Sequence, residues 1–414
     1  MVKIALMGHG VVGSGVAEVF YKNKQSLERK TGKELDIGYI LDLRDFPGLP
    51  YSDKFTKDFT LIENDPEVQV VVEVMGGLNP AYDFTKRCLE KGKSVVTSNK
   101  ELVAAKGAEL LQLARAHNVN YLFEASVGGG IPIIHPLHLC LAANEITEIA
   151  GILNGTTNYI LTKMIREKLP FDQALRQAQE LGYAERNPEA DIEGKDACRK
   201  ICILASLAFG RHVYPDLVHT EGITKVSLED VEYAASWGGV IKLIGDACKR
   251  SDGSVSIQVA PAFLSRESQL AGVDDVFNGI LVRGDATGDV VFYGKGAGKL
   301  PTASAVVADV IDAVKANGNS KSLFWKDGDE SVVEDYFKSV SAFYLRFQSA
   351  EPAARALAEE ALGPVRYLER SGSPVQEFAL VTQELSTGAL AGKLAELSAK
   401  GVQLLSKIRV LDKI

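Results

Sequence analysis

The side chains best suited to acid–base chemistry gather in residues 178–200. Glycines and a proline interrupt this stretch, and a strongly apolar run, residues 201–209, follows it. Carboxylates mixed with amines at the edge of a buried segment indicate a polar site and not ordinary surface. The charged members of this group are Glu185, Asp191, Glu193, Lys195, Asp196 and Lys200.

Asp196 and Lys200 are spaced to share one face of a helix that we expect to begin near Gly194. The same face continues into apolar residues, so the pair should lie at the rim of a core. Burial favours the neutral amine of a lysine, which can then exchange protons near neutral pH. The carboxylates can grip a substrate ammonium group, or they can simply neutralise the lysine. A solvated salt bridge would explain the spacing equally well.

The same stretch resembles a known family. Its spacing follows the signature of the homoserine dehydrogenases, which interconvert homoserine and aspartate 4-semialdehyde with a nicotinamide cofactor. The resemblance implies an NAD(P)-dependent oxidoreductase acting on a CH–OH group in threonine, methionine and isoleucine biosynthesis. The matching positions are Gly182, Asn187, Pro188, Asp191, Gly194, Asp196 and Lys200.

The N-terminal segment predicts a dinucleotide site. An apolar strand, residues 2–7, leads into a GxGxxG loop and then into a helix of apolar periodicity. In this setting glycine backbone approaches a pyrophosphate, and the helix N-terminus offers free N–H groups. His9, inside the loop, is interpreted as a variable position and not as a catalyst. The predicted cofactor contacts are Gly8, Gly10, Val11, Val12 and Gly13.

The second strand, residues 37–43, bears on the choice between NAD and NADP. Asp42 would suit the ribose hydroxyls of NAD, whereas Arg44 would favour the extra phosphate of NADP. Members of the family often carry an arginine before an aspartate at this place, as in Arg44-Asp45. We therefore favour NADP and leave NAD open, with Lys57 as a second candidate partner for phosphate.

Further apolar strands, residues 68–74 and a strand from Ser94, alternate with helices as in a parallel sheet. Open sheets of this kind bind ligands at the carboxyl ends of their strands, which here are loops 73–77 and 97–100. Lys100 begins a helix in the second loop, and its position alone would indicate a surface lysine. The resemblance instead places Lys100 in the catalytic pocket, and Ser98 beside the cofactor.

The resemblance implies the remaining roles. Lys200 is the expected acid–base catalyst, and Lys100 the second amine that orders the reacting oxygen. Thr157, in the NGTTN motif of residues 154–158, is expected to contact substrate, with helix capping as its alternative role. The other expected substrate contacts are Glu185, Asp191 and Asp196, and the other expected cofactor contacts are Gly182 and Gly298.

A glycine-rich loop, residues 121–133, brings main-chain carbonyls close together beside Glu124 and would suit a hard cation with oxygen ligands. A hinge between domains would use the same glycines. The resemblance implies a monovalent cation, most simply sodium, with a structural role. Its expected ligands are the Glu124 side chain and main-chain oxygens of Val127, Gly129 and Ile131.

Composition excludes several classes of protein. With 46% hydrophobic and 24% charged residues the chain has the profile of a soluble globular protein. A net charge of -8 without a basic block argues against nucleic acid or an anionic membrane as partner. Five cysteines without CxxC spacing predict neither a disulfide framework nor a zinc site. The chain opens on a strand with no signal peptide or membrane span, so we expect a cytoplasmic protein.

The length of 414 residues predicts two or three domains. We expect an α/β fold with a Rossmann-type dinucleotide-binding domain at 1–131, joined by a return segment at about 299–325. A middle α+β domain with a mixed sheet, at 132–298, would bind substrate. The resemblance implies that two subunits pair through this sheet, giving a homodimer or homotetramer.

The tail, residues 335–414, has the order βαββαβ of a ferredoxin-like module and resembles the ACT domain of many homoserine dehydrogenases. Such a domain can bind threonine, but residues 349–354 lack the glycine that usually opens the ligand loop. Pure oligomerisation is therefore an equal expectation for the tail. The rival functions are a non-catalytic amino-acid sensor and a different amino-acid dehydrogenase.

Overall fold

Two sheets organise the chain. The computed structural model describes residues 1–316 and 323–412. Contacts group the chain into a first unit, residues 1–145, 202–215 and 294–329, and a second unit, residues 146–201, 216–293 and 330–414. Residues 317–322 of the predicted return segment and residues 413–414 of the predicted tail lie outside the described part.

The first unit contains a parallel sheet of six strands in the order β3-β2-β1-β4-β5-β6. Its inner strands are nearly continuous apolar runs, because helices cover such a sheet on both faces. The prediction of a Rossmann-type domain is confirmed, although the second strand ends two residues earlier than expected. The strands are β1 (Val2–Met7), β2 (Leu35–Leu41), β3 (Phe55–Thr56), β4 (Val68–Glu73), β5 (Ser94–Thr97) and β6 (Tyr121–Leu122).

Helices alternate with these strands, and a late helix returns to pack on the first. The core of the unit combines residues of β1, β2 and α1 with Ala303, Val306 and Val310 of α10. Gly15 of α1 allows this approach, because a Cβ there would lie 2.8 Å from the Lys299 carbonyl oxygen. The helices are α1 (Val11–Thr31), α2 (Phe59–Asn64), α3 (Ala81–Glu90), α4 (Lys100–Ala116) and α10 (Lys299–Ala316).

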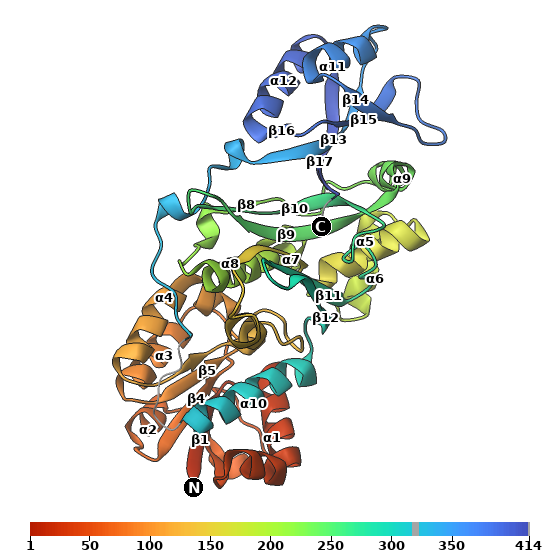
Figure 1. Cartoon of the computed structure of the whole chain (residues 1–414). Coiled ribbons are helices and arrows are strands. Elements are labelled where there is room, and N and C mark those ends of the chain that lie inside the picture. Colours follow the sequence, from red (N-terminus) through yellow and green to blue (C-terminus); the bar gives the residue numbers. More distant parts are fainter. Residues whose placement is uncertain (317–322, 413–414) are drawn as a thin grey trace. The chain divides into compact units, whose positions relative to one another are not determined.

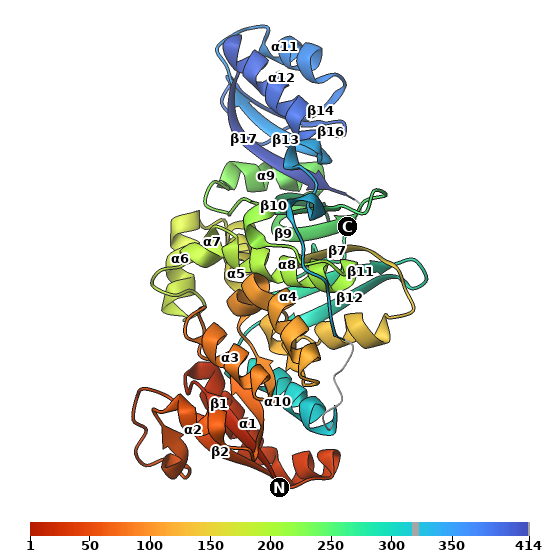
Figure 2. The ribbon, with the colours of Figure 1, turned by 90° about the vertical axis from the view of Figure 1, so that its left-hand side faces the viewer.

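The second unit is built on a mixed sheet in the order β12-β11-β7-β9-β10-β17-β13-β15-β14. The long antiparallel pair β9–β10 forms its centre, with registered residues from Val255 opposite Lys249 to Ser265 opposite Gly239. In both ribbon views α5, α7 and α8 lie together on one side of β9 (Figures 1 and 2). The strands before the tail are β7 (Ile146–Ile152), β8 (His219–Thr220), β9 (Gly239–Lys249), β10 (Val255–Ser265), β11 (Phe277–Gly284) and β12 (Gly288–Lys295).

The helices of this unit carry most of the predicted substrate residues. Helix α5 begins at Gly155 and includes both threonines of the NGTTN motif in its first turn. The reason is that the Asn154 side chain caps the helix, which draws the next residues into its first turn. The helices are α5 (Gly155–Glu167), α6 (Phe171–Glu180), α7 (Glu189–Ile192), α8 (Lys195–Phe209) and α9 (Leu228–Trp237).

The tail has the predicted βαββαβ order and a core of its own, which includes Phe343, Leu345 and Leu397. Its last strand also pairs in parallel with β10, where Ala262 is opposite Arg409, so the sheet runs unbroken from the middle segment into the tail. Whether the tail acts as a separate domain stays a prediction. Its elements are β13 (Val340–Gln348), α11 (Ala354–Leu362), β14 (Val365–Leu368), β15 (Glu377–Thr382), β16 (Leu385–Ser386), α12 (Thr387–Ala399) and β17 (Gln403–Leu411).

Among the described residues, no helix combines the length and the apolar character that crossing a membrane requires.

Candidate active site

Asp196 and Lys200 lie one turn apart on α8 and form the predicted pair. The Lys200 Nζ is 2.8 Å from Asp196 Oδ2. Only 7% of Lys200 and 5% of Asp196 is exposed, so this is not an ordinary solvated salt bridge. Two charged groups at this depth need close partners, because desolvation without them would cost several kcal/mol, roughly, for each ion.

Asn154 supplies a partner that sequence reasoning did not single out. Its Nδ2 donates to Asp191 Oδ1 at 2.7 Å and to Asp196 Oδ2 at 2.9 Å. Its Oδ1 accepts the Thr157 N–H at 2.9 Å, as an N-cap of α5 does. One buried amide therefore caps a helix and joins two carboxylates that lie 37 and 42 residues further along the chain.

The residue before Asn154 holds the lysine. Lys200 Nζ donates to the Leu153 carbonyl oxygen at 2.8 Å. Strand β7 ends at Ile152, and α5 begins at Gly155, so Leu153 and Asn154 form the tight junction between them. The two residues of this short junction therefore bind the charged pair: the Leu153 carbonyl oxygen binds the Lys200 amine, and the Asn154 side chain binds the Asp196 carboxylate.

A loop packs against the segment that joins α7 to α8. The Ile223 N–H donates to the Ile192 carbonyl oxygen at 2.8 Å. Gly222 approaches so closely that a Cβ would lie 2.1 Å from that same oxygen. Gly194 adopts a φ of +79°, which glycine tolerates, and the turn it makes starts α8. This support fixes the backbone that carries Asp191 and Asp196.

The other predicted substrate residues have less connected positions. Glu185 is exposed, and its main-chain oxygen accepts a bond from Gln179. Thr157 is buried, its hydroxyl donates to the Asn154 carbonyl oxygen at 3.1 Å, and its N–H is the donor that the Asn154 cap accepts. A substrate contact through Thr157 stays a prediction. Gly182, predicted to contact cofactor, follows α6 with a φ of +75°.

The GxGxxG loop of the first unit has the close backbone approach that a dinucleotide requires. Gly8 has a φ of +100°, and a Cβ on Gly13 would lie 2.0 Å from the Gly8 carbonyl oxygen. Helix α1 starts at Val11, and its cap, Gly10, has no side chain, so the first N–H groups face outward without obstruction. These residues fit a dinucleotide, whose pyrophosphate would meet the helix N-terminus.

A pocket of about 510 Å³ adjoins this loop. It extends from the end of β1 to the ends of β2 and β4, where an adenosine half of a dinucleotide belongs in this topology. Its polar and glycine lining residues are Gly8, Gly10, Asp42, Arg44, Lys57 and Gly76.

Asp42 and Arg44 bind each other, although sequence reasoning set them in opposition. The guanidinium of Arg44 donates to both carboxylate oxygens of Asp42, at 3.0 and 2.9 Å, and lies over the Phe46 ring. These bonds hold the pKa of the Asp42 carboxyl well below its usual range. The Arg44 side chain is 62% exposed, and Lys57 is 2.9 Å from Asp45. Two cations therefore line the adenosine end of the pocket.

The two strand-end loops of this unit are tied together through Glu73. This carboxylate is fully buried and accepts bonds from Met75 N at 2.8 Å and Thr97 Oγ1 at 2.6 Å. Burial raises its pKa. Asn99 reaches from the second loop to the Gly77 carbonyl oxygen at 2.6 Å and caps α4.

Lys100 is the first residue of α4 and is half-buried, and the Ser98 N–H donates to the Glu73 carbonyl oxygen at 3.4 Å. Both therefore lie at the carboxyl end of β5, where the sequence placed them. Lys100 belongs to the first unit and Lys200 to the second. Gly298, with a φ of +130°, immediately precedes α10 in the first unit.

Glu124, the predicted cation ligand, is buried among donors. Its Oε1 accepts the N–H groups of Ile133 and Ile134 at 2.6 and 2.9 Å, and its Oε2 accepts the His135 N–H at 2.7 Å. The His135 Nδ1 is 3.0 Å from the same Oε2. Bonds to Asp312 and Glu124 raise the pKa of His135 to about 10, so its ring is an imidazolium.

Each oxygen of Glu124 thus has two protein donors, which is about the full hydrogen-bonding capacity of a carboxylate. As arranged, this side chain does not fit the role of a direct cation ligand. Main-chain oxygens of Val127, Gly129 and Ile131 would have to supply the coordination. Among the described residues, no group of three or more His, Cys, Asp or Glu side chains is placed to hold a metal ion.

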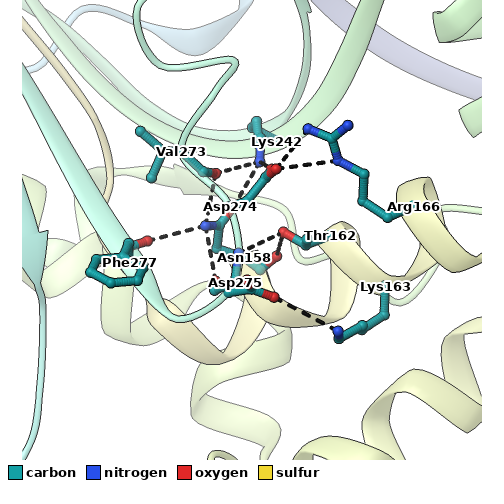
Figure 3. Close-up of polar contacts among 9 residues, drawn as sticks. All are labelled: Asn158, Thr162, Lys163, Arg166, Lys242, Val273, Asp274, Asp275 and Phe277. Atoms are coloured by element: carbon teal, nitrogen blue, oxygen red, sulfur yellow. Dashed lines mark hydrogen bonds and ion pairs between the residues drawn. The ribbon is translucent and has the colours of Figure 1, made fainter.

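A second buried lysine, Lys242 of β9, contacts α5 one turn further on (Figure 3). Its Nζ donates to Asn158 Oδ1 at 3.1 Å, to the Val273 carbonyl oxygen at 2.5 Å and to Asp274 Oδ1 at 3.1 Å. Lys242 has no exposed side-chain surface, and burial lowers its pKa. Asp274 is also paired with Arg166 at 2.8 Å.

Asn158 completes this second cluster. Its Nδ2 donates to the carbonyl oxygens of Val273, Asp275 and Phe277 at 3.0 to 3.1 Å (Figure 3). The loop before β11 is therefore bound to the first turns of α5. This lysine, aspartate and asparagine were not predicted, because Lys242 and Asp274 lie far from Asn158 in the sequence.

Comparisons with known proteins agree on one family. The family model described as "Homoserine dehydrogenase, NAD binding domain" matches residues 8–124, and the model described as "Homoserine dehydrogenase" matches residues 132–311. The homoserine dehydrogenase of Synechocystis is 43% identical over 363 residues, which are 84% of this chain and 83% of that protein.

Solved structures extend the likeness to the tail. The homoserine dehydrogenase from Thiobacillus denitrificans has a TM-score of 0.91 and 34% identity, and the match covers 99% of this chain and 98% of that one. A hyperthermophilic archaeal homoserine dehydrogenase mutant in complex with NADPH has a TM-score of 0.64 and 29% identity over 75% of this chain and 97% of that one.

The two family models cover both the dinucleotide loop and the α5–α8 site, and the full-length structural match includes the sheets that carry them. The predicted fold class and family are therefore confirmed. The chain belongs to the homoserine dehydrogenase family, NAD(P)-dependent oxidoreductases that act on a CH–OH group and interconvert L-homoserine and L-aspartate 4-semialdehyde.

Proposed function

We propose that Lys200 is the acid–base catalyst of this reaction and that Lys100 is the second amine of the site. The observation that supports Lys200 is its burial between the Asp196 carboxylate and the Leu153 carbonyl, each 2.8 Å from Nζ. The bound dinucleotide supplies the hydride acceptor. In the oxidation direction the neutral amine of Lys200 accepts the hydroxyl proton of the substrate and returns it in the reduction direction.

Carboxylates near this amine would hold the other end of the substrate. We assign the ammonium group of homoserine to Asp191 and Asp196, because an amine pairs with carboxylates that are fixed in position, and we propose the exposed Glu185 as a further contact. Fixing the ammonium group sets the distance between the reacting carbon and Lys200. Thr157 would contribute by holding the first turn of α5.

The oxidation of homoserine should have an alkaline pH optimum. Oxidation needs the neutral amine of Lys200, and the neighbouring Asp196 carboxylate favours the ammonium form. Reduction of the aldehyde begins from the ammonium form, so it should tolerate lower pH. The two directions of one reaction would then respond to pH in opposite ways.

The test is the initial rate of reduced-cofactor formation from L-homoserine at alkaline pH in wild type and in Lys200→Ala. We expect kcat to fall by about 10³-fold or more, since proton transfer and the charge next to the reacting oxygen are lost together. The unfolding temperature should also fall, because Asp196 loses its buried partner, so kcat is referred to the amount of folded protein. A Lys200→Ala variant with more than a tenth of the wild-type rate would overturn the assignment of Lys200. If the wild type did not oxidise homoserine, a panel of other amino-acid substrates would be tested.

The family membership leaves the preferred cofactor open, and we propose NADP. Arg44 and Lys57 line the adenosine end of the pocket, and the family includes the archaeal mutant enzyme solved with NADPH. The extra phosphate of NADP would replace Asp42 as the partner of the Arg44 guanidinium and accept two charge-assisted hydrogen bonds from it. The backbone of Gly8 to Gly13 would hold the pyrophosphate, with further contacts proposed from Ser98, Gly182 and Gly298.

Arg44→Ala tests this preference. The KM for NADP should rise about tenfold or more, which is the worth of one charge-assisted pair, and the KM for NAD should fall or stay unchanged. The measurement is the ratio of kcat/KM for NADP to that for NAD in the two proteins. An unchanged ratio would show that Arg44 does not recognise the phosphate.

We also propose a monovalent cation, most simply sodium, in the loop of residues 124–131. Main-chain oxygens of Val127, Gly129 and Ile131 would be its ligands, and the Glu124 carboxylate would add negative charge nearby. Unfolding temperature measured in sodium, potassium and choline chlorides at equal ionic strength tests this, because a bound cation stabilises the folded state. Equal unfolding temperatures in the three salts would show that this loop binds neither sodium nor potassium.

Three further expectations remain proposals. The tail could bind threonine, and an isothermal titration without heat of binding would exclude it. We propose a homodimer or homotetramer paired through the second sheet, which sedimentation would test. A cytoplasmic location is the third, and cell fractionation would test it. A purely non-catalytic sensor is not favoured, because the family itself is enzymatic.

A further inference from the structure

We infer that Asn154 is a positioning residue of the active site. Its amide holds the Asp191 and Asp196 carboxylates at a fixed separation, and the preceding carbonyl, that of Leu153, holds Lys200. The two-residue junction of Leu153 and Asn154 thereby fixes the position of the carboxylates that would bind the substrate ammonium group and the position of the Lys200 amine. This inference rests on the proposed roles of Asp196 and Lys200.

The orientation of the Asn154 amide is fixed by its neighbours. Its Oδ1 accepts the N–H of Thr157, at 2.9 Å. The Nδ2 must therefore face away from the helix, where it meets the two carboxylates. Asn154 is only 5% exposed, so water cannot easily replace these bonds.

An amide suits this place better than any charged group. An NH₂ group has two hydrogens and here offers one to each carboxylate, at 2.7 and 2.9 Å. Two carboxylates this close repel each other, and one of them would take up a proton without such donors. Because the amide is neutral, it separates and satisfies them while both keep the negative charge that the substrate ammonium group needs.

The turn that carries Asn154 is itself anchored. Asn158, one turn later on α5, donates to two carbonyl oxygens of the loop before β11 and to that of Phe277, the first residue of β11, and it accepts a bond from Lys242 (Figure 3). The start of α5 is therefore held on both sides, by the loop and by β9. A side chain mounted on a fixed turn can set a distance, whereas one on a mobile loop cannot.

Asn154→Ser is the direct test. Serine is a good N-cap and keeps an acceptor for the Thr157 N–H, but it has no second donor for the two aspartates. We expect a fall of about 10- to 100-fold in kcat/KM for homoserine, with contributions from both kcat and KM, and an unchanged KM for the dinucleotide. A merely structural role would lower the amount of active protein without changing KM for homoserine.

Ser386→Ala serves as the control. Ser386 caps α12 in the tail, where its side chain accepts the Ala389 N–H at 3.2 Å. Loss of this cap should lower the unfolding temperature and leave kcat/KM for homoserine unchanged. The contrast separates the loss of a cap from the loss of the bridge between Asp191 and Asp196.

Asn154→Asp keeps the shape and the cap acceptor but replaces the NH₂ group with an oxygen, which adds a third carboxylate to the two aspartates. At high pH all three carboxylates repel, whereas at lower pH one takes up a proton and can donate to a neighbour. Measured as aldehyde reduction from about pH 9 to about pH 6, the deficit of Asn154→Asp should shrink as pH falls. The deficit of Asn154→Ser, which adds no third carboxylate, should depend on pH less steeply.

These outcomes distinguish the positioning role of Asn154 from the catalytic role of Lys200. If Lys200→Ala is inactive but Asn154→Ser retains wild-type kcat/KM within twofold, the positioning role is wrong and the catalytic assignment stands. If Asn154→Ser unfolds, the pH dependence of Asn154→Asp decides, and a constant deficit across the pH range overturns the inference. If Lys200→Ala is active, the proposed function fails first, whatever Asn154 does.

Discussion

Two clusters on successive turns of α5 each combine an asparagine, an aspartate and a lysine, but one belongs to the candidate active site and the other stabilises the fold. In one, Asn154 joins Asp196, which pairs with Lys200. In the other, Asn158 accepts a bond from Lys242, which pairs with Asp274. Both lysines are buried, and both also donate to a main-chain carbonyl oxygen.

The difference lies in what surrounds each amine. The Lys242 amine donates to three protein oxygens, has no exposed surface, and ties a loop to a helix. Lys200 lies at the rim of its core beside a second carboxylate, Asp191, which is half-buried and joined through Asn154. A saturated buried lysine stabilises the fold, whereas one beside an excess of carboxylates can serve a cationic substrate. Burial alone therefore does not identify a catalytic lysine.

The largest expected effect on stability comes from Lys242→Met, which would break the structural cluster. It removes the ammonium group and leaves Asn158 Oδ1 and the Val273 carbonyl oxygen without that donor, so we expect a loss of about 3 kcal/mol in the free energy of unfolding. The kcat of the molecules that remain folded should stay within about threefold of wild type, since the Asn158 Nδ2 keeps its bonds to the three carbonyl oxygens and still holds the start of α5.

Denaturant unfolding, with activity measured on the same samples, checks this prediction. Arg166→Met is the matched control, because it removes the exposed partner of Asp274 and should cost less than about 1 kcal/mol. If Lys242→Met were stable but inactive, the roles given to the two lysines would have to be exchanged.

A smaller effect is expected from Glu221, which supports the second unit from beside the Gly222 loop. A hydrogen bond from His219 at 2.7 Å lowers the pKa of Glu221 to about 2 from its usual 4.5, and Lys407 adds to the shift. A lowered carboxyl pKa stabilises the fold above the usual value, and that stability is lost as pH falls from 4.5 towards 2.

Glu221→Gln should therefore lower the free energy of unfolding by about 1 kcal/mol at neutral pH, after allowance for the partial exposure of the side chain. The difference from wild type should vanish as the pH approaches 2. Denaturant unfolding at several pH values measures it, with Glu189→Gln as the control for an exposed pair. A difference that persists undiminished in acid would show that the charge of Glu221 is not its source.

Local patterns predicted the parts of the site that lie close together in the sequence. The i,i+4 spacing of Asp196 and Lys200 predicted a pair, and the structure has it at 2.8 Å. The GxGxxG loop and the position of Lys100 at a strand end follow from the same kind of rule, since strand, turn and helix are adjacent along the chain.

Contacts between distant segments could not be predicted in this way. Asn154 precedes Asp191 and Asp196 by 37 and 42 residues, and its role depends on how α5 and α8 pack. A local signal did exist, because an asparagine before a glycine and two threonines is a good N-cap. The bond between Asp42 and Arg44 depends on side-chain direction at the end of β2, which spacing does not specify.

The donors around Glu124 are a further example. Spacing placed this carboxylate beside glycines, but the turn that follows aims three N–H groups and the His135 ring at it.

The tail also contains a contact that local patterns could not predict. Its βαββαβ order was readable, whereas the pairing of β17 with β10 involves segments that only the folded chain brings together.

The most direct test of the acid–base assignment is rescue of Lys200→Ala by a small primary amine. Homoserine oxidation is followed at alkaline pH while ethylamine is added. We expect the rate to rise with amine concentration and to follow the fraction of free base as pH is varied, because the added amine replaces the lost proton acceptor. Rapid turnover by Lys200→Ala with no amine present, above a tenth of the wild-type rate, would contradict the assignment.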